Sequence, residues 1–329
     1  MHIAIPDDYQ RVIRTLDCFA RLAGHEVTLF HDLQPASPDE LAQRFADAEA
    51  LVLTRERTRI DAALLDQLPK LKLISQTGKV AGHIDLDACT ARGIVVTEGR
   101  GSPVAPAELA WALILNARRQ LVPAIEAFKA GQWQVNLGQA VAGQVLGIWG
   151  YGKIGQRLAR YAQAFDMPVL VWGSEQSRAA AVADGHQTAA SREAFFAEAD
   201  IVSLNLRLSE RTRHVVTADD LARMKESALL VNISRAELVA PGVLLHALEA
   251  GRPGYAALDV FEQEPLLAPD HPLLTHPRVL CTPHLGYVEK NGYELYFGDA
   301  FDNLLAFFNG EPKNMVNPEA LRAMIKAAE

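Results

Sequence analysis

Cysteine is scarce in this sequence of 329 residues, which contains only three, all far apart: Cys18, Cys89 and Cys281. An odd number of widely spaced cysteines supplies neither a disulfide framework nor the ligand spacing of a cysteine-based zinc site. Such usage is typical of a reducing compartment. We therefore expect a cytoplasmic protein with no metal centre.

Excess basic charge and long apolar runs are also missing. The formal charge is −8 and no Lys/Arg-rich stripe occurs, which argues against a nucleic acid or an anionic membrane as the main partner. No run approaches the roughly 18 apolar residues of a membrane span, and the N-terminus lacks the basic start and apolar core of an export signal. We therefore expect no export signal, no membrane anchor and no nucleic-acid partner.

The sequence has enough residues for two domains. In its first part, short apolar runs alternate with stretches of helical period, which predicts a parallel sheet with helical crossovers. The expected strands are 2–5, 26–30, 50–54, 71–78 and 93–97, and the helical stretches are 9–22, 39–45, 61–68 and 86–92.

A second alternation follows the Gly/Pro-rich joint 98–108, an apolar helix expected over 108–121 and a polar connection over 130–143. The apolar stretch 293–308 has helical spacing but no strand after it, so we expect it to pack back on the first lobe. The fold class predicted is α/β, with two Rossmann/flavodoxin-like parallel-sheet domains, 1–102 with 286–329 and 103–285, and a site in the cleft between them. The second series has expected strands 144–150, 168–173, 200–206, 227–234, 255–260 and 278–282, and helices 154–165, 179–183 and 242–250.

A glycine-rich turn, Gly150-x-Gly152-x-x-Gly155, stands between an apolar strand and a long helix. In that context the first glycine permits a tight turn, the second lets a pyrophosphate approach the backbone, and the third lets helix and strand pack closely. The alternative is a merely tight structural turn. We predict a dinucleotide site formed by Gly150, Tyr151, Gly152, Lys153, Ile154 and Gly155.

The strand after this turn normally ends in an acid that binds the adenosine ribose and disfavours a 2′-phosphate. Here it ends with Gly173, Ser174 and Glu175, and the acid is displaced by two residues. Glu175 favours NAD, whereas Ser174 and Arg178 are equally suited to receive the phosphate of NADP.

Three polar residues follow later strands of the second series: Arg235 in VNISRA, Glu264 in DVFEQEP and His284 in TPHLG. Parallel sheets bind ligands at the carboxyl ends of their strands, so we expect these side chains to converge. Taken singly, each has a plainer interpretation: His284 a loop residue, Glu264 a turn cap, and Arg235 a surface partner of Glu237.

The segments GYGKIG, VNISRA, DVFEQEP and TPHLG, in this order and spacing, resemble the D-isomer-specific 2-hydroxyacid dehydrogenases. The likeness extends over nearly the whole chain, from LPKLKLISQTG to NMVNPEAL, and is greatest for the branch of 3-phosphoglycerate dehydrogenases and glyoxylate/hydroxypyruvate reductases. It implies hydride transfer between a nicotinamide cofactor and a small D-2-hydroxy acid or 2-oxo acid.

The resemblance also implies roles for the polar residues. His284 would exchange a proton with the substrate oxygen, Glu264 would hold the far ring nitrogen, and Arg235 would bind the substrate's carboxylate and carbonyl. Asp259 would contact the nicotinamide amide, although an Asp at a strand end can simply cap the next turn. The further cofactor contacts that it implies are Thr212, Ile233, His284 and Gly286.

For the first domain, the resemblance implies that the turn Lys79-Val80-Ala81 grips the substrate carboxylate with its backbone N–H groups. Arg55 would face a distal anionic group. The alternatives are a solvated loop lysine at Lys79 and a surface ion pair of Arg55 with Glu56 or Asp61. Three positions depart from the family pattern: Ala236 replaces a glycine, Arg207 replaces a proline, and GSPVAPAELAW has no asparagine. Arg207 would lie close to the adenosine and either bind a 2′-phosphate or line the rim. The missing asparagine leaves the substrate unassigned by branch.

Two further expectations concern assembly and a rival function. The apolar helix 108–121 is a plausible contact of a homodimer, although packing inside the chain explains it nearly as well. The rival function is NAD(H) sensing without catalysis, as in the corepressor relatives of this fold. Those relatives tend to add partner-binding tails, which this sequence lacks.

Overall fold

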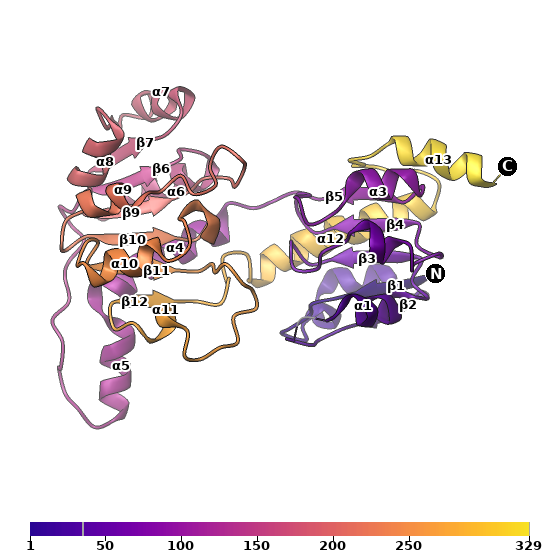
Figure 1. The fold of residues 1–329 in the computed structure, drawn as a ribbon, viewed down its shortest axis with the longest axis horizontal. Coiled ribbons are helices and arrows are strands. Elements are labelled where there is room, and N and C mark those ends of the chain that lie inside the picture. Colours follow the sequence, from indigo (N-terminus) through magenta and orange to yellow (C-terminus); the bar gives the residue numbers. More distant parts are fainter. Residues whose placement is uncertain (35, 329) are drawn as a thin grey trace. The chain divides into compact units, whose positions relative to one another are not determined.

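The computed structural model describes residues 1–34 and 36–328. The chain forms two compact units, one of Met1–Ser102 with Glu289–Glu329 and one of Pro103–Val288 (Figure 1). The second segment of unit 1 contains α12 (Lys290–Phe308), whose nineteen residues include the apolar stretch 293–308. Among the residues described, no helix is long and apolar enough to cross a membrane.

Unit 1 contains a five-stranded parallel sheet in the order β2-β1-β3-β4-β5. In this order the first two strands are exchanged, as in flavodoxin-like folds. The register places Gln76, the last residue of β4, opposite Glu98, the last residue of β5. The strands are β1 (His2–Ile5), β2 (Glu26–Leu29), β3 (Ala50–Leu53), β4 (Leu73–Gln76) and β5 (Val95–Glu98).

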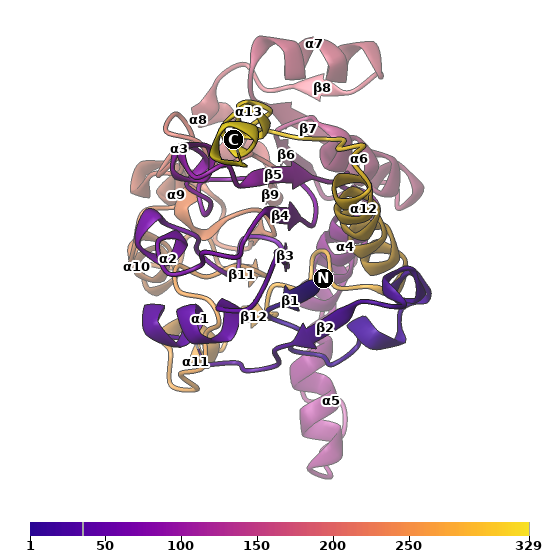
Figure 2. The ribbon, with the colours of Figure 1, turned by 90° about the vertical axis from the view of Figure 1, so that its right-hand side faces the viewer.

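Helices cover both faces of this sheet. Figure 2 shows α1 (Pro38–Phe45), α2 (Ala62–Leu65) and α3 (Leu86–Ala91) on one face and α12 on the other. Each of the three short helices starts with a side-chain cap, from Ser37, Asp61 and Asp85, which satisfies backbone N–H groups of the first turn. The last helix, α13 (Glu319–Ala328), lies beside α3.

The helical period predicted over 9–22 is wrong as a continuous helix. The structure has two short 3-10 helices there, η1 (Ile13–Thr15) and η2 (Asp17–Leu22), with extended backbone at Leu16 between them. Asp8 accepts hydrogen bonds from the backbone N–H groups of Val12 and Ile13, so its side chain competes with a helical start. The apolar spacing is met by burial of Ile13 and its neighbours without an α-helix.

Unit 2 contains a seven-stranded parallel sheet in the order β12-β11-β10-β9-β6-β7-β8. The chain starts in the middle at β6, runs to one edge, and returns to β9 on the other side of β6, which is the doubly wound Rossmann order. The strands are β6 (Leu146–Trp149), β7 (Val169–Trp172), β8 (Gln187–Thr188), β9 (Ile201–Leu204), β10 (Leu229–Asn232), β11 (Tyr255–Leu258) and β12 (Val279–Cys281).

Two apolar cores flank the sheet of unit 2. One core joins the sheet to α4 (Val104–Arg119), α6 (Lys153–Ala164) and α7 (Glu175–Ala183). The other joins it to α8 (Arg192–Glu198), α9 (Ala218–Arg223) and α10 (Val243–Glu249). The central strands are therefore buried on both faces, which explains their continuous apolar sequences.

The helix expected over 108–121 has different bounds. α4 already begins at Val104, because a proline at position 106 is tolerated in a first turn, and Gln120 in the left-handed conformation (φ 51°) ends it. A separate helix, α5 (Leu121–Lys129), follows and extends away from the sheet of its own unit (Figure 1). The apolar face of α4 is buried in the core of unit 2, with Trp111 and Ile114 at its centre.

Candidate active site

Three neighbouring strands of unit 2 carry the predicted polar residues just beyond their carboxyl ends. β10, β11 and β12 are adjacent and parallel, and Asn232, Leu258 and Cys281 are in register. Arg235 follows the first of these residues by three positions, and His284 follows the last by three. The fold thus brings segments that are distant in sequence to the same side of the sheet, where the carboxyl ends of these strands lie.

His284 and Glu264 form a hydrogen-bonded pair beyond the carboxyl ends of these strands. Nδ1 of His284 lies 2.5 Å from Oε2 of Glu264, and the two side chains are 24% and 32% exposed. The other carboxylate oxygen, Oε1, accepts the backbone N–H of Phe261 at 2.9 Å. Both oxygens are therefore occupied, which fixes the carboxylate and leaves Nε2 as the imidazole nitrogen that can exchange a proton.

The backbone of His284 is held in a conformation that few side-chain-bearing residues adopt. Its φ is 52°, and its N–H donates to the carbonyl of Thr282. The Tyr287 ring packs against the imidazole in a T-shaped arrangement, with ring centroids 5.4 Å apart. A strained conformation of this kind persists only where the surroundings impose it.

The side chain of Asp259 holds the backbone of His284 in that conformation. Its carboxylate is fully buried and accepts the Thr282 hydroxyl at 2.6 Å and the backbone N–H groups of Leu285 and Gly286 at 2.7 and 2.8 Å. These partners flank His284 on both sides. Burial raises the pKa of Asp259 above its ordinary value, against the lowering effect of these hydrogen bonds. The resemblance implied a cofactor contact here, and the bonds that the structure contains go to the histidine turn.

Arg235 leads from β10 into the 3-10 helix η3 (Ala236–Leu238). Its Nη1 donates to the carbonyl of Ser234 at 2.7 Å, and its own carbonyl accepts the side-chain amide of Asn232 at 2.8 Å. Alanine at position 236 opens this helix, which needs no left-handed residue. The replacement of the usual glycine is therefore compatible with the local backbone.

The glycine-rich turn has a separate steric reason for each glycine. A Cβ at Gly150 (φ 99°) would lie 2.6 Å from the carbonyl oxygen of Asn205, and a Cβ at Gly155 would lie 2.4 Å from that of Gly150. A Cβ at Gly152, the N-cap residue of α6, would meet nothing within 4 Å. The first and third glycines are needed by the protein itself, and the space at the second fits a pyrophosphate at the helix N-terminus.

Asn205 is a residue of this site that the sequence analysis missed. It follows β9, the neighbour of β6 across the point where strand order reverses. Its Nδ2 donates to Ser203, whereas its buried Oδ1 has no hydrogen-bond partner among residues 1–34 and 36–328. A buried acceptor without a partner beside the glycine turn is consistent with a donor supplied by a ligand. Its place at a strand end beside the reversal of order was the available signal.

The other predicted residues of the glycine turn and of β7 have differing surroundings. Tyr151 is buried, and its hydroxyl donates to Asp184, so only its backbone faces the turn.

Ser174 caps α7 by accepting the backbone N–H of Ser177. The guanidinium of Arg178 stacks on the ring of Trp172 at 4.8 Å. The exposed residues Lys153 and Glu175 open α6 and α7, while Ile154 packs against the core.

Three further predicted cofactor contacts lie after β9 and β10. Arg207 is exposed, and its carbonyl accepts the hydroxyl of Thr212 at 2.7 Å, which closes a turn. The side chain of Ile233 is 6% exposed and belongs to a core cluster. Thr212 and Ile233 therefore have local structural roles. The backbone of Thr212 is also bound locally, since its N–H donates to the carbonyl of Ser209 and its carbonyl accepts the N–H of Val215.

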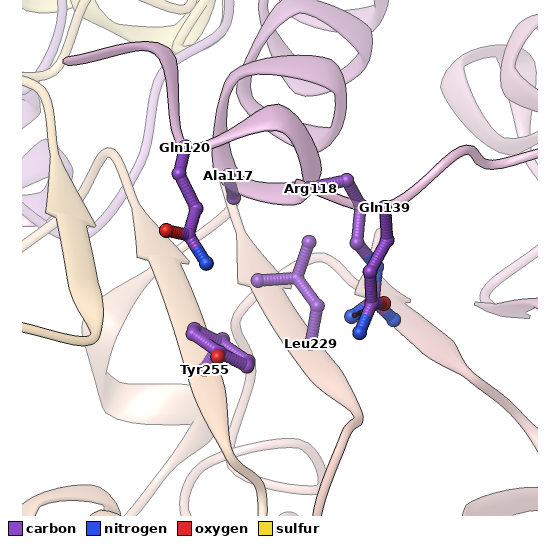
Figure 3. A pocket seen from close by; sticks show the side chains of 6 residues that line it. All are labelled: Ala117, Arg118, Gln120, Gln139, Leu229 and Tyr255. Atoms are coloured by element: carbon purple, nitrogen blue, oxygen red, sulfur yellow. Dashed lines mark hydrogen bonds between the residues drawn. The ribbon is translucent and has the colours of Figure 1, made fainter. Parts of the chain in front are cut away.

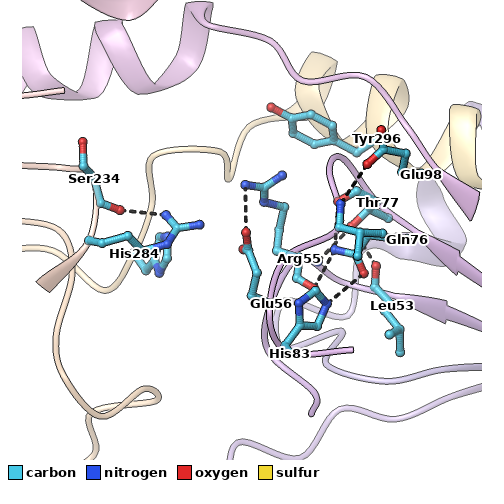
Figure 4. Close-up of polar contacts among 12 residues, drawn as sticks. Leu53, Arg55, Glu56, Gln76, Thr77, His83, Glu98, Ser234, His284 and Tyr296 are labelled. Atoms are coloured by element: carbon cyan, nitrogen blue, oxygen red, sulfur yellow. Dashed lines mark hydrogen bonds and ion pairs between the residues drawn. The ribbon is translucent and has the colours of Figure 1, made fainter. Parts of the chain in front are cut away.

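The predicted substrate residues lie in unit 1, around the turn that follows β4. Nη1 of Arg55 occupies the space that a Cβ of Gly78 (φ 81°) would need, and its guanidinium lies 5.9 Å from the centroid of the Tyr296 ring. Nη2 of Arg55 is 3.7 Å from Oε1 of Glu56. Figure 4 shows Arg55, Glu56 and Tyr296 with Gln76, whose amide donates to the Arg55 carbonyl.

Lys79 and Val80 both contact Glu98. The Lys79 ammonium pairs with Oε1 of Glu98, and the Val80 N–H donates to Oε2 at 3.1 Å. The carbonyl of Ala81, the third residue of the predicted turn, accepts the N–H of Ile84 at 3.4 Å. Lys79 is thus an exposed partner of an acid on the neighbouring strand.

A small pocket lies at the amino ends of the unit 2 strands, where β10 and β11 begin (Figure 3). Among the residues that line it, Arg118 donates to the carbonyls of Asp200 and Ser227, both at 2.6 Å. These bonds tie α4 to the starts of β9 and β10, so we assign Arg118 a structural role. The pocket is lined by Ala117, Arg118, Gln120, Gln139, Leu229 and Tyr255.

Comparison with known proteins identifies the family. Residues 111–286 match the model of the D-isomer specific 2-hydroxyacid dehydrogenase, NAD binding domain. A glyoxylate reductase from Aeropyrum pernix is 35% identical over 309 residues, which cover 91% of each chain. This chain is a D-isomer-specific 2-hydroxyacid dehydrogenase.

Solved structures of this family agree in fold. An oxidoreductase from Ralstonia solanacearum is 51% identical, with a TM-score of 0.95 and coverage of 97% of this chain and 98% of that one. A phosphoglycerate oxidoreductase from Vibrio cholerae O395 is 54% identical, with a TM-score of 0.91 and coverage of 94% and 99%. The predicted α/β class with two parallel sheets is confirmed.

Membership establishes the general chemistry. The dehydrogenase is an enzyme that uses NAD(P) for the oxidation and reduction of 2-hydroxy and 2-oxo acids. The comparisons do not favour the alternative of a non-catalytic NAD(H) sensor.

Proposed function

We propose that this dehydrogenase reduces a small 2-oxo acid to the D-2-hydroxy acid. The candidate substrates are glyoxylate, hydroxypyruvate and phosphohydroxypyruvate, the 2-oxo acid that corresponds to 3-phosphoglycerate. The observation that carries the proposal is the His284–Glu264 pair, in which both oxygens of the Glu264 carboxylate are hydrogen-bonded. The pair follows the carboxyl ends of neighbouring strands, as Arg235 does. Bound nicotinamide coenzyme supplies or accepts the hydride.

In this proposal His284 gives the proton from Nε2 to the substrate oxygen in reduction and takes it back in oxidation. Glu264 stabilises the imidazolium and fixes the tautomer through Nδ1. Arg235, a planar cation with paired donors, holds the substrate's carboxylate and carbonyl together and so orients the carbon that reacts.

The remaining roles divide between the units. We assign unit 1 to substrate binding, with the backbone of Lys79, Val80 and Ala81 for the carboxylate and Arg55 for a distal anion. We assign unit 2 to the dinucleotide. Gly286 belongs to the histidine turn and the Asp259 carboxylate holds that turn, so we expect both to act on the cofactor side through the turn.

NAD is the proposed coenzyme. Glu175 stands at the first turn of α7, and its negative charge disfavours a 2′-phosphate nearby. A comparison of Kd for NADH and NADPH tests this. Tighter binding of NADPH would transfer the role to Ser174 and Arg178.

A homodimer is the proposed assembly, and its contact differs from the helix expected from the sequence. α5 and the segment after it carry exposed apolar side chains, whereas the large apolar side chains of α4 are buried or partly buried against a core of unit 2. The large apolar side chains are Leu121 (38% exposed), Val122 (39%), Ile125 (51%), Phe128 (64%), Trp133 (74%), Val135 (52%) and Leu137 (92%). A second copy that covers this stretch would bury them.

The compartment proposed is the cytoplasm. All three cysteines are free thiols, two of them buried, as is usual in a reducing environment.

The test of the proposed function is consumption of NADH and NADPH with glyoxylate, hydroxypyruvate, pyruvate and phosphohydroxypyruvate. The wild-type enzyme should reduce at least one acid, and His284→Ala should lower kcat about 10²- to 10⁴-fold, the usual worth of a general acid–base. Coenzyme affinity should not change in this variant. Equal turnover by the variant would remove His284 from the mechanism, and no turnover with any acid would contradict the proposed substrates.

A further inference from the structure

Glu98 reaches the turn to which the proposed function assigns the substrate's carboxylate. It is the last residue of β5 and lies in register with Gln76, the last residue of β4. Its two carboxylate oxygens are occupied by the Lys79 ammonium and, at 3.1 Å, by the Val80 N–H. Figure 4 shows the Glu98 side chain beside Thr77, which precedes this turn.

The position of Glu98 is set by the fold rather than by Lys79. Its backbone N–H donates to the carbonyl of Asn314 at 3.0 Å, and its own carbonyl accepts the side-chain amide of Asn303 at 3.1 Å. The Glu98 side chain is 22% exposed, whereas that of Lys79 is 63% exposed. A carboxylate is therefore built into this site on a fixed strand end, with a flexible cation on its solvent side.

The donors that hold Glu98 are the kind that a substrate carboxylate needs. A backbone N–H has a single proton, so it makes one strong hydrogen bond at a time. Two carboxylates that share such a site repel each other. A substrate carboxylate can bind the Val80 N–H only after Glu98 has left it.

We propose that Glu98 sets the affinity for the substrate, as an internal carboxylate that competes with the substrate's carboxylate for the turn Lys79-Val80-Ala81. The inference rests on the proposed function, because it takes from there the assignment of this turn to substrate. Each binding event then exchanges the Glu98–Val80 bond for a substrate bond. The exchange weakens the affinity for small carboxylates and leaves the proton-transfer site unchanged.

The experiment measures carboxylate affinity with and without turnover in Glu98→Gln and Glu98→Ala. The first readout is the Kd of oxalate by titration calorimetry, and the second is KM for glyoxylate with kcat. Glu49→Gln is the matched control, because Glu49 pairs with Lys72 at 3.0 Å in the same unit and precedes β3. Thermal denaturation shows whether each variant is folded.

Both Glu98 variants should lower the Kd of oxalate and KM about five- to tenfold, the worth of one charge-assisted hydrogen bond in a partly exposed site. kcat should stay within about twofold, and the control should match the wild type. Detectable binding of oxalate by the Glu98 variants but not by the wild type would also support the competition.

A Kd that is unchanged or higher in both Glu98 variants would overturn the proposal and show that Glu98 supports the turn instead. Failure of every folded variant to bind oxalate would overturn it as well. A wild-type enzyme that binds oxalate but reduces no acid would refute the proposed substrates, while the Kd ratio would still decide the role of Glu98.

Discussion

Replacing Glu264 by glutamine tests the charge of the His284–Glu264 pair at almost constant shape. The two carboxylate oxygens accept from two donors, the Phe261 N–H at 2.9 Å and Nδ1 of His284 at 2.5 Å. A glutamine amide has one accepting oxygen and one donating nitrogen. It cannot satisfy both donors, so the variant either frees the loop at Phe261 or turns a donor toward His284.

The loss is at least one charge-assisted hydrogen bond. Such bonds contribute about 1.5–3 kcal/mol. Because the two side chains are 24% and 32% exposed, solvent screens the pair and the lower end of this range applies. Since about 1.4 kcal/mol corresponds to tenfold in rate, kcat for reduction should fall roughly tenfold in Glu264→Gln.

The assay is stopped-flow oxidation of NADH by the acid that the wild type reduces best, at saturating coenzyme. Glu262→Gln is the matched control, since Glu262 is an exposed residue two positions earlier in the same loop. The control should retain wild-type kcat, and the Kd of NADH should be the same in all three proteins.

Two results would refute this reasoning. An unchanged kcat in Glu264→Gln would show that the carboxylate charge has no part in proton transfer. An equal loss in Glu262→Gln would show that the effect belongs to the loop and not to the pair.

Other substitutions separate cofactor binding, stability and assembly. Gly155→Ala should destabilise unit 2 by roughly 2 kcal/mol or more, because its Cβ would overlap a backbone oxygen, whereas Gly152→Ala should leave Tm unchanged and weaken NADH binding about tenfold, as calorimetry of both variants would show. Asp299→Asn should lower the free energy of unfolding by about 0.5–1 kcal/mol at pH 7. Arg100 holds the pKa of folded Asp299 below its ordinary value of 3.8, so this difference should be full above pH 3.8 and shrink as the pH falls further, a trend that urea denaturation at several pH values would check. If the protein is the proposed dimer, Leu137→Asp should give a monomer in light scattering, and a wild-type protein with the monomer mass would contradict the proposed contact.

The sequence predicted the features that depend on local pattern. Strands buried on both faces have continuous apolar runs, so the two parallel sheets could be found from the sequence and are confirmed. Gly150 and Gly155 are required by close backbone contacts, which is why the glycine spacing located the turn correctly. The stretch 9–22 failed because the side chain of Asp8 binds backbone N–H groups that a helix would have needed.

Contacts that depend on register could not be predicted. The pairing of Glu98 with Val80 follows from the alignment of β4 with β5, and no local pattern specifies that alignment. The family resemblance assigned Asp259 to a contact with the nicotinamide. Its three hydrogen bonds to the histidine turn depend on β11 and β12 lying side by side, so no local pattern predicted them. The roles of individual site residues stay predictions until the variants are measured.

Label transfer tests the central claim most directly. Hydroxypyruvate is incubated with wild-type enzyme and nicotinamide coenzyme carrying deuterium at the transferred position, and the glycerate formed is analysed for label and configuration. The account predicts D-glycerate with deuterium on C2, formed at least about 100-fold more slowly by His284→Ala. L-glycerate, or unlabelled glycerate, would contradict it.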